Sequence, residues 1–511
     1  MEKAVVKDEP QFLGHPPGLY VLFFTEMWER FSYYGMRALL MLYMTQYLLF
    51  EPEKAASVLG YDSIRWLLES SFGPLGVQPM ASQIYGLYTG FVYLTPLFGG
   101  IIADKVWGQR KTVYVGGILM AIGHFLMAFD HLFLFALFFL IIGNGAFKPN
   151  ISTQVGNLYP DGDPRKDGAF TIFYMGINLG AFLSPLVCGT LGQVYGWHYG
   201  FNAAGIGMVL GLAFYHFGRH YLPTDSFSQK MNNPDDPLAI TDRSRKIVLM
   251  KILGGFTLFT LGFLSLFIIP HWLKVIFILA VIALVVHYIR SLPEDERYRV
   301  GALILLCLGT ITFWAAFEQQ GNTLQLWADS KTRWEFLGWT VPSTWYQSFN
   351  PAFIFLFAPL LNMYWERQIK KGLTPSTSVR KMGIGSLLCG AAFLFMILAA
   401  KVVPADERGS LMWLVMTTWL FTMGELYLSP IGLSLVTKVS PPRMVSMMMG
   451  MWFLSSFFGN YASGFLGSFY APMKEAGQLD LFFASVAMLG IATGVFFFLA
   501  EKRMVKIIGK V

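Results

Sequence analysis

Four ionisable side chains lie close together in a stretch of sequence that is otherwise apolar. The stretch is Glu26-Met-Trp-Glu-Arg-Phe-Ser-Tyr-Tyr-Gly-Met-Arg37, and apolar residues flank it on both sides. An ionisable group at the centre of a bilayer costs at least about 2.5 kcal/mol, so four in one helix need counter-charges or a function. Acids and bases inside a membrane-spanning helix are typical of proton relays and of sites for charged substrates. This stretch is the first candidate functional site.

The spacing of the stretch predicts a polar stripe on one helix. With about 100° between successive residues, six polar side chains fall within roughly 140° of arc: Glu26, Glu29, Arg30, Tyr33, Tyr34 and Arg37. Such a stripe must face other helices or a water-filled cavity. A purely structural ion pair between Glu26 and Arg30, four residues apart, is the alternative, but it does not account for Glu29 and Arg37.

A further base follows in the fourth apolar segment. Lys148 directly precedes Pro149. The proline removes a helical hydrogen bond and disfavours helical geometry just before it. A lysine in a weakened, buried helix can change its protonation state, because burial and nearby carboxylates move its pKa in opposite directions. The alternative is a lysine that extends to the cytoplasmic surface.

Two polar side chains share a face of the fifth apolar segment. Tyr174 and Asn178 are four residues apart, and Gly180 permits close helix contact beside them. The pair predicts either a substrate-binding phenol and amide or a hydrogen bond between helices.

The second half of the chain supplies the acids. Glu318 follows Trp314 by one turn, and Glu425 precedes Ser429 by one turn, again next to a proline. A further polar residue, Asn350, opens another apolar segment before Pro351. Basic residues of the first half and acidic residues of the second would give a central cavity one positive and one negative wall. Such a cavity suits a zwitterion whose charges lie apart, as in a short peptide, better than a free amino acid.

Composition identifies the elements that must carry these residues. Of the 511 residues, 55% are hydrophobic and only 14% are charged, which indicates an all-α integral membrane protein. Apolar windows of roughly 18–25 residues, each long enough to cross about 30 Å of hydrocarbon, recur along the chain. Fourteen spans are predicted, near residues 19–49, 81–102, 112–129, 131–154, 168–192, 199–218, 247–269, 272–289, 300–323, 345–365, 382–401, 410–436, 444–470 and 480–500.

The order of the spans predicts two six-helix halves. The hydrophilic segment 218–245, which contains Asn-Asn-Pro-Asp-Asp-Pro, separates the first six spans from the rest. We predict an N-terminal six-helix bundle in residues 1–218, a cytoplasmic linker with an inserted transmembrane hairpin in 219–299, and a C-terminal six-helix bundle in 300–511. Paired halves are typical of alternating-access transporters.

The net charge of +7 is distributed between the two sides of the membrane. If the spans alternate from a cytoplasmic N-terminus, cytoplasmic segments hold 26 Lys and Arg and outer segments hold 8. The cytoplasmic residues include Lys3, the cluster 243–246 and Lys510. This asymmetry follows the positive-inside rule, so it predicts both termini in the cytoplasm and no nucleic-acid partner.

Two of these stretches resemble signatures of a known family. Glu26-x-x-Glu-Arg-Phe-x-Tyr-Tyr-Gly35 resembles the first-helix signature of the proton-dependent oligopeptide transporter (POT/PTR) family. Phe173-Tyr-Met-x-Ile-Asn-x-Gly180 resembles its fifth-helix signature. Gly99-Gly-Ile-Ile-Ala-Asp104, followed by Gly108-Gln-Arg-Lys111, resembles the loop motif of the major facilitator superfamily. The resemblance runs from the first span to the last, and the extra hairpin is typical of prokaryotic members.

The resemblance implies a fold and a function. The fold is that of the major facilitator superfamily, with 12 core transmembrane helices in two six-helix bundles plus the inserted hairpin. The function is proton-coupled symport, importing di- and tripeptides by rocker-switch alternating access, by a monomer in the bacterial inner membrane. No cofactor is expected, because the proton gradient supplies the energy.

Other functions are weighed against this one. The same fold could carry nitrate or another non-peptide solute, although an anion carrier has little use for Glu425. A non-transporting membrane receptor is a second alternative. An enzyme is not expected, because the spans contain no His-Glu-x-x-His, no Gly-x-Ser-x-Gly and no paired metal ligands.

The resemblance also implies roles for single residues. Proton coupling is assigned to Glu26, Glu29, Arg30, Lys148 and Glu318. Substrate binding is assigned to Tyr34, Arg37, Tyr93, Lys148, Tyr174, Asn178, Asn350, Glu425 and Ser429. Gate salt bridges are expected between Arg37 and Glu318 on the outer side and between Lys148 and Glu425 on the inner side.

Two features depart from the family pattern. Phe317 stands where some relatives carry another acid, which leaves the number of coupled protons open. The outer segment 51–80 is longer than usual, and both a lid and a plain external loop fit its sequence.

Overall fold

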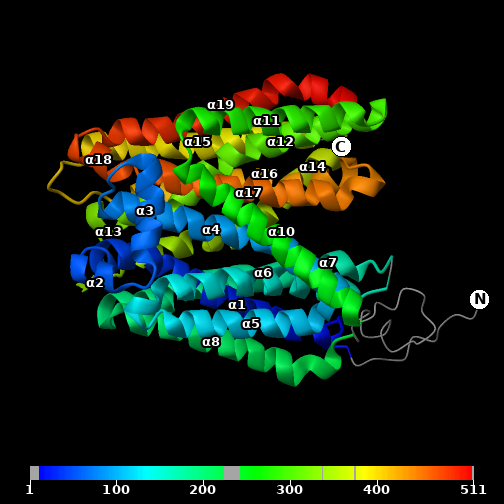
Figure 1. Cartoon of the computed structure of the whole chain (residues 1–511), viewed down its shortest axis with the longest axis horizontal. Helices are drawn as coiled ribbons and strands as arrows, with labels where there is room; N and C mark the ends of the chain where they lie inside the picture. The colour runs from blue at the N-terminus through cyan, green and yellow to red at the C-terminus, as the bar shows by residue number, and fades with distance from the viewer. Residues whose placement is uncertain (1–10, 161, 224–241, 337, 373–375, 509–511) are drawn as a thin grey trace, which may run out of the picture. The chain divides into compact units, whose positions relative to one another are not determined.

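The computed structural model consists almost entirely of helices (Figure 1) and describes residues 11–160, 162–223, 242–336, 338–372 and 376–508. Lys3, Lys510 and the Asn-Asn-Pro-Asp-Asp-Pro stretch lie outside the described residues. Fourteen helices of at least 18 residues lie at the fourteen predicted spans, so that prediction is confirmed. They are α1 (Pro17–Tyr43), α4 (Val77–Ile102), α5 (Gln109–Leu126), α6 (Phe133–Asn157), α7 (Arg165–Ser184), α8 (Trp197–Gly218), α10 (Asp242–Ile268), α11 (His271–Ser291), α12 (Glu294–Phe317), α14 (Phe349–Lys370), α15 (Ser378–Val402), α16 (Met412–Val439), α17 (Val445–Gly467) and α19 (Leu479–Ile508).

The helix α1 differs from the other long helices in its charge. Ten segments built on the described long helices are long and apolar enough to cross a membrane by length and composition alone. The helix α1 is not among them, because every 18-residue stretch of it contains Glu26, Glu29 and Arg30. The element with the strongest candidate site is therefore one that hydropathy alone does not identify as a span.

Short elements connect or extend the long helices. The described residues form four further α-helices, α2 (Pro52–Ser57), α3 (Tyr61–Phe72), α13 (Thr323–Lys331) and α18 (Tyr470–Glu475). Turns of π- or 3-10 helix are η1 (Met44–Leu48), η2 (Ala103–Trp107), η3 (Asp130–Leu132), η4 (Pro185–Gly189), η5 (Leu191–Tyr195), η6 (Arg219–Tyr221), η7 (Glu318–Gly321), η8 (Ser343–Ser348) and η9 (Pro442–Met444). One antiparallel pair joins β1 (Glu335–Phe336) to β2 (Trp339–Thr340), with Phe336 opposite Trp339.

The chain divides into two compact units. Unit 1 contains residues 1–37 and 95–257, and unit 2 contains residues 38–94 and 258–511. Three helices pass from one unit to the other, because the divisions fall within α1, α4 and α10. The predicted boundaries at 218 and 300 follow the order of spans along the chain, and they stay a prediction.

Close helix contact around α1 shapes unit 1. A Cβ atom added to Gly180 of α7 would lie 2.9 Å from the backbone nitrogen of Phe31, so α7 contacts the backbone of α1 where a larger residue would not fit. This confirms the close contact predicted at Gly180. In the same unit, α5 runs beside α6 and α8 (Figure 1), and a Cβ on Gly116 would lie 2.6 Å from the Gly143 carbonyl. Close contact thus joins α7 to α1 and α5 to α6.

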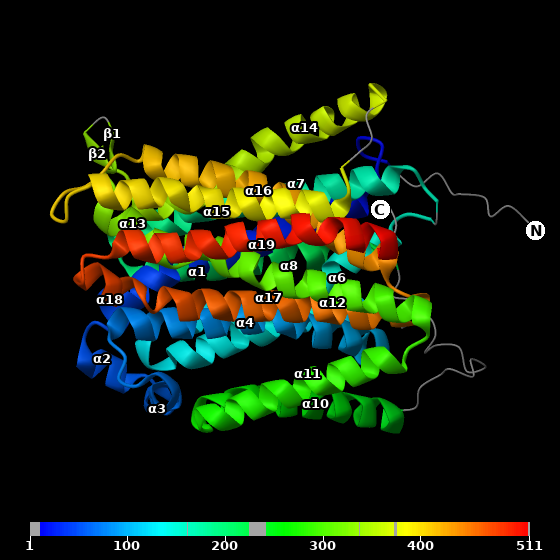
Figure 2. The same ribbon diagram turned by 90° about the horizontal axis from the view of Figure 1, so that it is seen from above.

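A layer of three helices forms the most extensive packing in unit 2. The helix α15 lies between α16 and α19 (Figure 2). Buried aromatic rings join these helices, with the Phe393 centroid 5.2 Å from that of Phe421 and 6.3 Å from that of Phe483. Apolar burial of this kind fixes the frame on which the polar residues of α12, α14 and α16 are carried.

The outer segment 51–80 is a folded element rather than a plain loop. It contains α2 and α3, and the ring of Phe72 packs against Phe267 of α10 and Phe465 of α17. The Lys274 ammonium of α11 donates to the Ser71 hydroxyl at 2.7 Å. Elsewhere α10 and α11 are largely exposed, as expected for an inserted hairpin that faces lipid.

Candidate functional site

The polar stripe of α1 forms a buried ion cluster in unit 1. The Arg30 Nε atom lies 2.9 Å from Glu26 Oε1 and 2.5 Å from Glu29 Oε2. All three side chains are at most 4% exposed. The predicted ion pair between Glu26 and Arg30 is therefore present, but Arg30 contacts both carboxylates. One guanidinium shared by two carboxylates leaves an excess of negative charge within these three residues.

The helix α6 supplies two further members of this cluster. The Asn144 amide donates to Glu29 Oε1 at 3.3 Å from a fully buried position. The positive charge of Lys148, one turn further along α6, acts on both Glu26 and Glu29. Lys148 thus adds a second base whose charge acts on the two carboxylates, beside that of Arg30. The proline after it is followed by a buried amide, since Asn150 Nδ2 donates to the Ala146 carbonyl at 2.7 Å.

The C-terminal part of the stripe carries aromatic and cationic groups together. The Arg37 guanidinium lies 6.0 Å from the centroid of the Tyr34 ring, a geometry that allows a cation–π interaction. Arg37 is 8% exposed, and Tyr34 is half-buried. The rings of Tyr33 and Tyr34 meet edge to face at 5.2 Å. This end of the stripe presents a positive charge framed by phenols.

The predicted pair on α7 is arranged within its own helix. Asn178 Nδ2 donates to the backbone carbonyl of Tyr174 at 2.9 Å, so this contact is to the main chain and not to the phenol. Asn178 is buried, whereas the Tyr174 side chain is exposed. The sequence placed both groups on one face, but it could not show that the amide binds a helix carbonyl.

A second polar group lies in unit 2, between α14 and α16. Asn350 Nδ2 donates to Glu425 Oε2 at 3.0 Å and to Thr422 Oγ1 at 3.1 Å. Thr422 is fully buried, and Glu425 is half-buried. The α16 backbone comes close to α15 at the neighbouring position, where a Cβ on Gly424 would lie 2.7 Å from the Gly385 carbonyl. Tight packing therefore fixes the helix turn that carries Glu425.

The remaining predicted residues of unit 2 lie on η7, α16 and α4. Glu318 begins the 3-10 turn η7 and is 1% exposed. Ser429 lies on α16, one turn after Glu425, and is half-buried. Tyr93 lies on the part of α4 that belongs to unit 2, and it is also half-buried.

Two residues of these groups were not predicted from sequence. Asn144 is four residues before Lys148, and Thr422 is three residues before Glu425, so each shares a helix face with a predicted residue. Helical spacing from the charged residue was the signal that could have identified them. Asn144 donates directly to the Glu29 carboxylate, whereas Thr422 accepts from the amide of Asn350, which in turn donates to Glu425.

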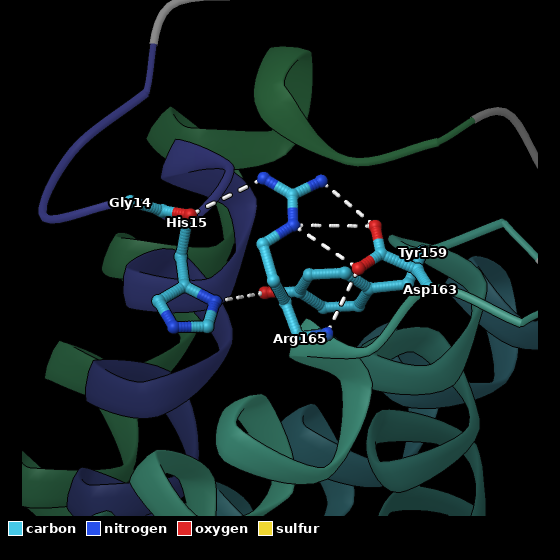
Figure 3. A network of polar contacts seen from close by, with 5 residues as sticks. All are labelled: Gly14, His15, Tyr159, Asp163 and Arg165. Atoms are coloured by element: carbon cyan, nitrogen blue, oxygen red, sulfur yellow. Dashed lines mark hydrogen bonds and ion pairs between the residues drawn. The ribbon is translucent and has the colours of Figure 1, made fainter.

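A polar network outside the spans joins the segment before α1 to the α6–α7 connection (Figure 3). His15 Nδ1 lies 2.8 Å from the Tyr159 hydroxyl, and Arg165 donates to the Gly14 carbonyl at 3.2 Å. Arg165 also pairs with Asp163, and these hydrogen bonds lower the pKa of Asp163 to about 2. Burial raises the pKa of Tyr159 to about 12. This network fixes the chain at the start of α1 and α7.

No group of three or more His, Cys, Asp or Glu side chains within the described ranges is arranged to hold a metal ion. The side chains of the two polar groups can transfer protons, form ion pairs, and donate or accept hydrogen bonds.

Comparison with known proteins identifies the family. The sequence profile PTR2, described as POT family, matches residues 110–482. The di-/tripeptide transporter of Lactococcus lactis subsp. cremoris is 35% identical, with 99% of each chain covered. Peptide transporter YePEPT of Yersinia enterocolitica subsp. palearctica serotype O:3 is 36% identical, covering 94% of this chain and 92% of its own.

Solved structures support the same assignment. A crystal structure of peptide transporter POT in complex with sulfate superposes with a TM-score of 0.79 at 32% identity, covering 98% of this chain and 97% of that one. The shared fold extends over α1 and over the inserted hairpin. With a profile match over most of its length and full-length relatives at this identity, the chain belongs to the POT family of membrane transporters.

Proposed function

We propose that this chain imports di- and tripeptides together with protons, by alternating access between two six-helix halves. The observation that carries the proposal is the buried cluster of Glu26, Glu29 and Arg30 beside Lys148, in a chain of the POT family. Relatives named di-/tripeptide transporter and peptide transporter support the substrate class.

Charge balance in the cluster explains how proton binding is coupled to peptide binding. When both carboxylates are ionised, they balance the positive charges of Arg30 and Lys148. A proton on either carboxylate leaves one positive charge in excess, which the carboxylate of a peptide can neutralise. Because an uncompensated charge is costly away from water, proton and peptide bind more favourably together than separately.

The two ends of the peptide are assigned to the two polar groups. The carboxylate end is assigned to Tyr34, Arg37, Lys148 and Asn178, with Tyr93 and Tyr174 lining the pocket. The ammonium end is assigned to Glu425, with Asn350 and Ser429 beside it. The hydrogen bond from Asn350 to Glu425 supports this assignment, since it fixes a carboxylate oxygen in place.

Proton binding must also change which side of the transporter is open. We assign the outer gate to Arg37 with Glu318 and the inner gate to Lys148 with Glu425. A proton on a carboxylate removes its attraction for the base and so weakens that gate. Inward proton movement gains roughly 2.3 kcal/mol per 100 mV of membrane potential, which is the energy available for accumulation.

The cellular setting follows from charge and composition. We place the chain in the bacterial inner membrane, with both termini in the cytoplasm, because Lys and Arg concentrate in the predicted cytoplasmic segments. A single chain contains every residue assigned to the site, so we propose that it works as a monomer. The proton gradient is its energy source, and no cofactor is assigned.

Uptake into proteoliposomes tests the proposal. The purified chain is reconstituted, an inward proton gradient is imposed, and the accumulation of labelled dialanine is measured with nitrate or free alanine as competitor. We expect accumulation above equilibrium that stops when a protonophore collapses the gradient. Neither competitor should reduce it.

Other outcomes identify the alternatives. Competition by nitrate, with no accumulation of dialanine, would indicate an anion carrier of the same fold. Binding of dialanine without uptake in either direction would indicate a receptor. Uptake that persists after the gradient is collapsed would contradict proton coupling.

A further inference from the structure

A wholly apolar pocket opens on unit 1 behind the charged stripe of α1. It has a volume of about 340 Å³. All its lining residues are apolar or glycine: Met27, Trp28, Phe31, Gly180, Leu183, Val187, Ala203, Ile206, Gly207 and Leu210. Residues 27–31 lie near the middle of α1, which runs over Pro17–Tyr43, so the pocket lies near the middle of the membrane.

We propose that this pocket binds the acyl chain of a membrane lipid. Its rim continues into the exposed apolar surface of the same helices, since Val187 is 43% and Ile206 is 56% exposed. In a chain that crosses the membrane, this surface is in contact with lipid. The pocket is thus a depression in the lipid-facing surface and not part of the polar cluster.

The size and chemistry of the pocket select this occupant. Water is disfavoured, because the Trp28 indole carries the one N–H donor among the lining side chains, and a bound water needs several polar partners. A helix of another protein is too large to be the occupant. One turn of a helix about 10 Å across, with a pitch of 5.4 Å, fills roughly 420 Å³, which exceeds the volume of the pocket. A flexible hydrocarbon chain fits the space without that width.

The physical basis of binding is packing rather than the hydrophobic effect. A lipid tail is already in an apolar medium, so transfer into the pocket gains dispersion contacts with the walls but no burial from water. The polar headgroup lies far from the pocket, so occupancy should depend on the acyl chain and not on the headgroup. The bound chain would contact Trp28 and Phe31, on the face of α1 opposite the carboxylates.

Fluorescence quenching by brominated lipids tests the proposal. The protein is reconstituted in phosphatidylcholine or phosphatidylethanolamine brominated near the end of one acyl chain. The signal of Trp28 is obtained as the difference between the wild type and Trp28→Phe. We expect this signal to be quenched at least twofold, equally in both lipids. The variant Ala203→Leu, which fills the pocket, should lose most of the quenching.

The matched control is Ala283→Leu, which enlarges an exposed residue of α11 away from the pocket. This control should leave the quenching unchanged. A Trp28 signal that brominated lipid does not quench, or that Ala203→Leu does not protect, would overturn the proposal. So would disulfide-linked dimers of Ile206→Cys in place of quenching, because they would identify a second copy of the chain as the occupant.

A separate observation concerns the turn that carries Glu318. The residues that follow it are anchored by fully buried hydrogen bonds within unit 2. Ser82 of α4 donates to Asn322 Oδ1 at 2.8 Å, and Asn322 donates to the Ser463 carbonyl of α17 at 3.3 Å. Gln319 donates to the same carbonyl at 3.0 Å. We infer that Ser82 and Asn322 are positioning residues for Glu318.

This second inference rests on the proposed role of Glu318 in gating. The network joins α4, of the first six predicted spans, to α17, of the last six, and to the turn η7 and the residue that follows it. Within unit 2 the two backbones also touch, because a Cβ on Gly86 would lie 2.7 Å from the Cα atom of Gly464. If the two halves move against each other during transport, these hydrogen bonds must break and form again. The orientation of Glu318 would change with them.

The pH profile of uptake tests this role. Ser82→Ala should shift the pH of half-maximal dialanine uptake by roughly 0.5 unit or more, because it changes the surroundings of Glu318. Ser82→Thr, which keeps the hydroxyl, should retain the wild-type profile. Equal profiles for Ser82→Ala and the wild type would overturn the inference, as would a loss of uptake that is the same at every pH. An inactive wild type would instead contradict the proposed function.

Discussion

The two polar groups of the chain hold their carboxylates in opposite ways. In unit 1, Glu26 and Glu29 share one guanidinium at 2.9 and 2.5 Å, almost without exposure to solvent. In unit 2, Glu425 is half-buried and receives a hydrogen bond from a neutral amide, Asn350, at 3.0 Å. The first arrangement crowds like charges around a shared base, and in the second an amide donates a hydrogen bond to a single carboxylate.

This difference suggests a division of roles. Two carboxylates that share one guanidinium repel each other. A proton that binds to one of them removes this repulsion. An amide that donates to a carboxylate holds it in one orientation, with its other oxygen positioned to accept from a cation. We therefore expect the unit 1 cluster to change protonation during transport and the unit 2 group to bind the peptide ammonium.

Removal of the fixed charge in unit 2 should have the largest effect. Glu425→Gln keeps the size of the side chain but cannot pair with an ammonium group. We expect dialanine uptake to fall at least about 30-fold, because the loss of one partner of a buried charge pair costs about 2–5 kcal/mol. Initial uptake rates in proteoliposomes measure it.

Glu366→Gln is the matched control for this change, since Glu366 is an exposed carboxylate near the end of α14. It should leave uptake unchanged. Normal uptake by Glu425→Gln would contradict the assignment of the peptide ammonium to unit 2.

Neutralising a carboxylate of unit 1 should abolish proton-driven accumulation of peptide but leave peptide exchange intact. In Glu26→Gln or Glu29→Gln, one member of the competing pair can no longer change its charge. We expect the accumulation of dialanine driven by a proton gradient to fall to equilibrium, while exchange of internal for external peptide continues. The two variants are compared in accumulation and in counterflow assays.

The comparison between these variants sharpens the role of each glutamate. If either variant still concentrates peptide, that glutamate does not carry the coupled proton. Loss of both accumulation and exchange would assign the residue to substrate binding instead. Asn144→Leu should affect coupling in the same direction as Glu29→Gln, since Asn144 contacts Glu29.

The fold and the charged residues of the site could be predicted from sequence for physical reasons. Fourteen apolar windows correspond to fourteen long helices, because an apolar segment of that length has few alternatives in a membrane. The stripe on α1 follows from helical spacing alone. Charged residues in such a segment are costly, which is why Glu26, Glu29 and Arg30 were conspicuous.

What could not be predicted depends on contacts between helices. The sequence does not show that Arg30 contacts both glutamates, or that Asn144 reaches Glu29, because both depend on how closely α6 and α7 approach α1. The sequence also does not show that the Asn178 amide donates to a main-chain carbonyl of its own helix. The folding of segment 51–80 into α2 and α3 depends on its packing against Phe267 and Phe465.

A smaller effect is expected where a neutral residue supports Glu425. Thr422→Val removes the hydroxyl that accepts a hydrogen bond from Asn350 and changes the shape of the side chain little. We expect the KM for dialanine to rise roughly fivefold, as a lost hydrogen bond of about 1 kcal/mol implies, with little change in maximal rate. Thr422→Ser keeps the hydroxyl and should restore the wild-type KM. A change in the maximal rate without a change in KM would show that Thr422 does not support peptide binding.

The smallest effect is expected outside the spans, where the pair of Asp163 and Arg165 provides a control for pH dependence. Hydrogen bonds from Arg165 lower the pKa of Asp163 from 3.8 to about 2. A lowered pKa stabilises the folded state above pH 3.8, and this contribution is lost as the pH falls towards 2. The melting temperatures of the wild type and Asp163→Asn should therefore differ by a constant, small amount between pH 5 and 8, and converge only below about pH 4. Dialanine uptake by this variant should keep the wild-type pH profile. A shifted profile would show that pH acts on transport through the α6–α7 connection and not only through the carboxylates of α1.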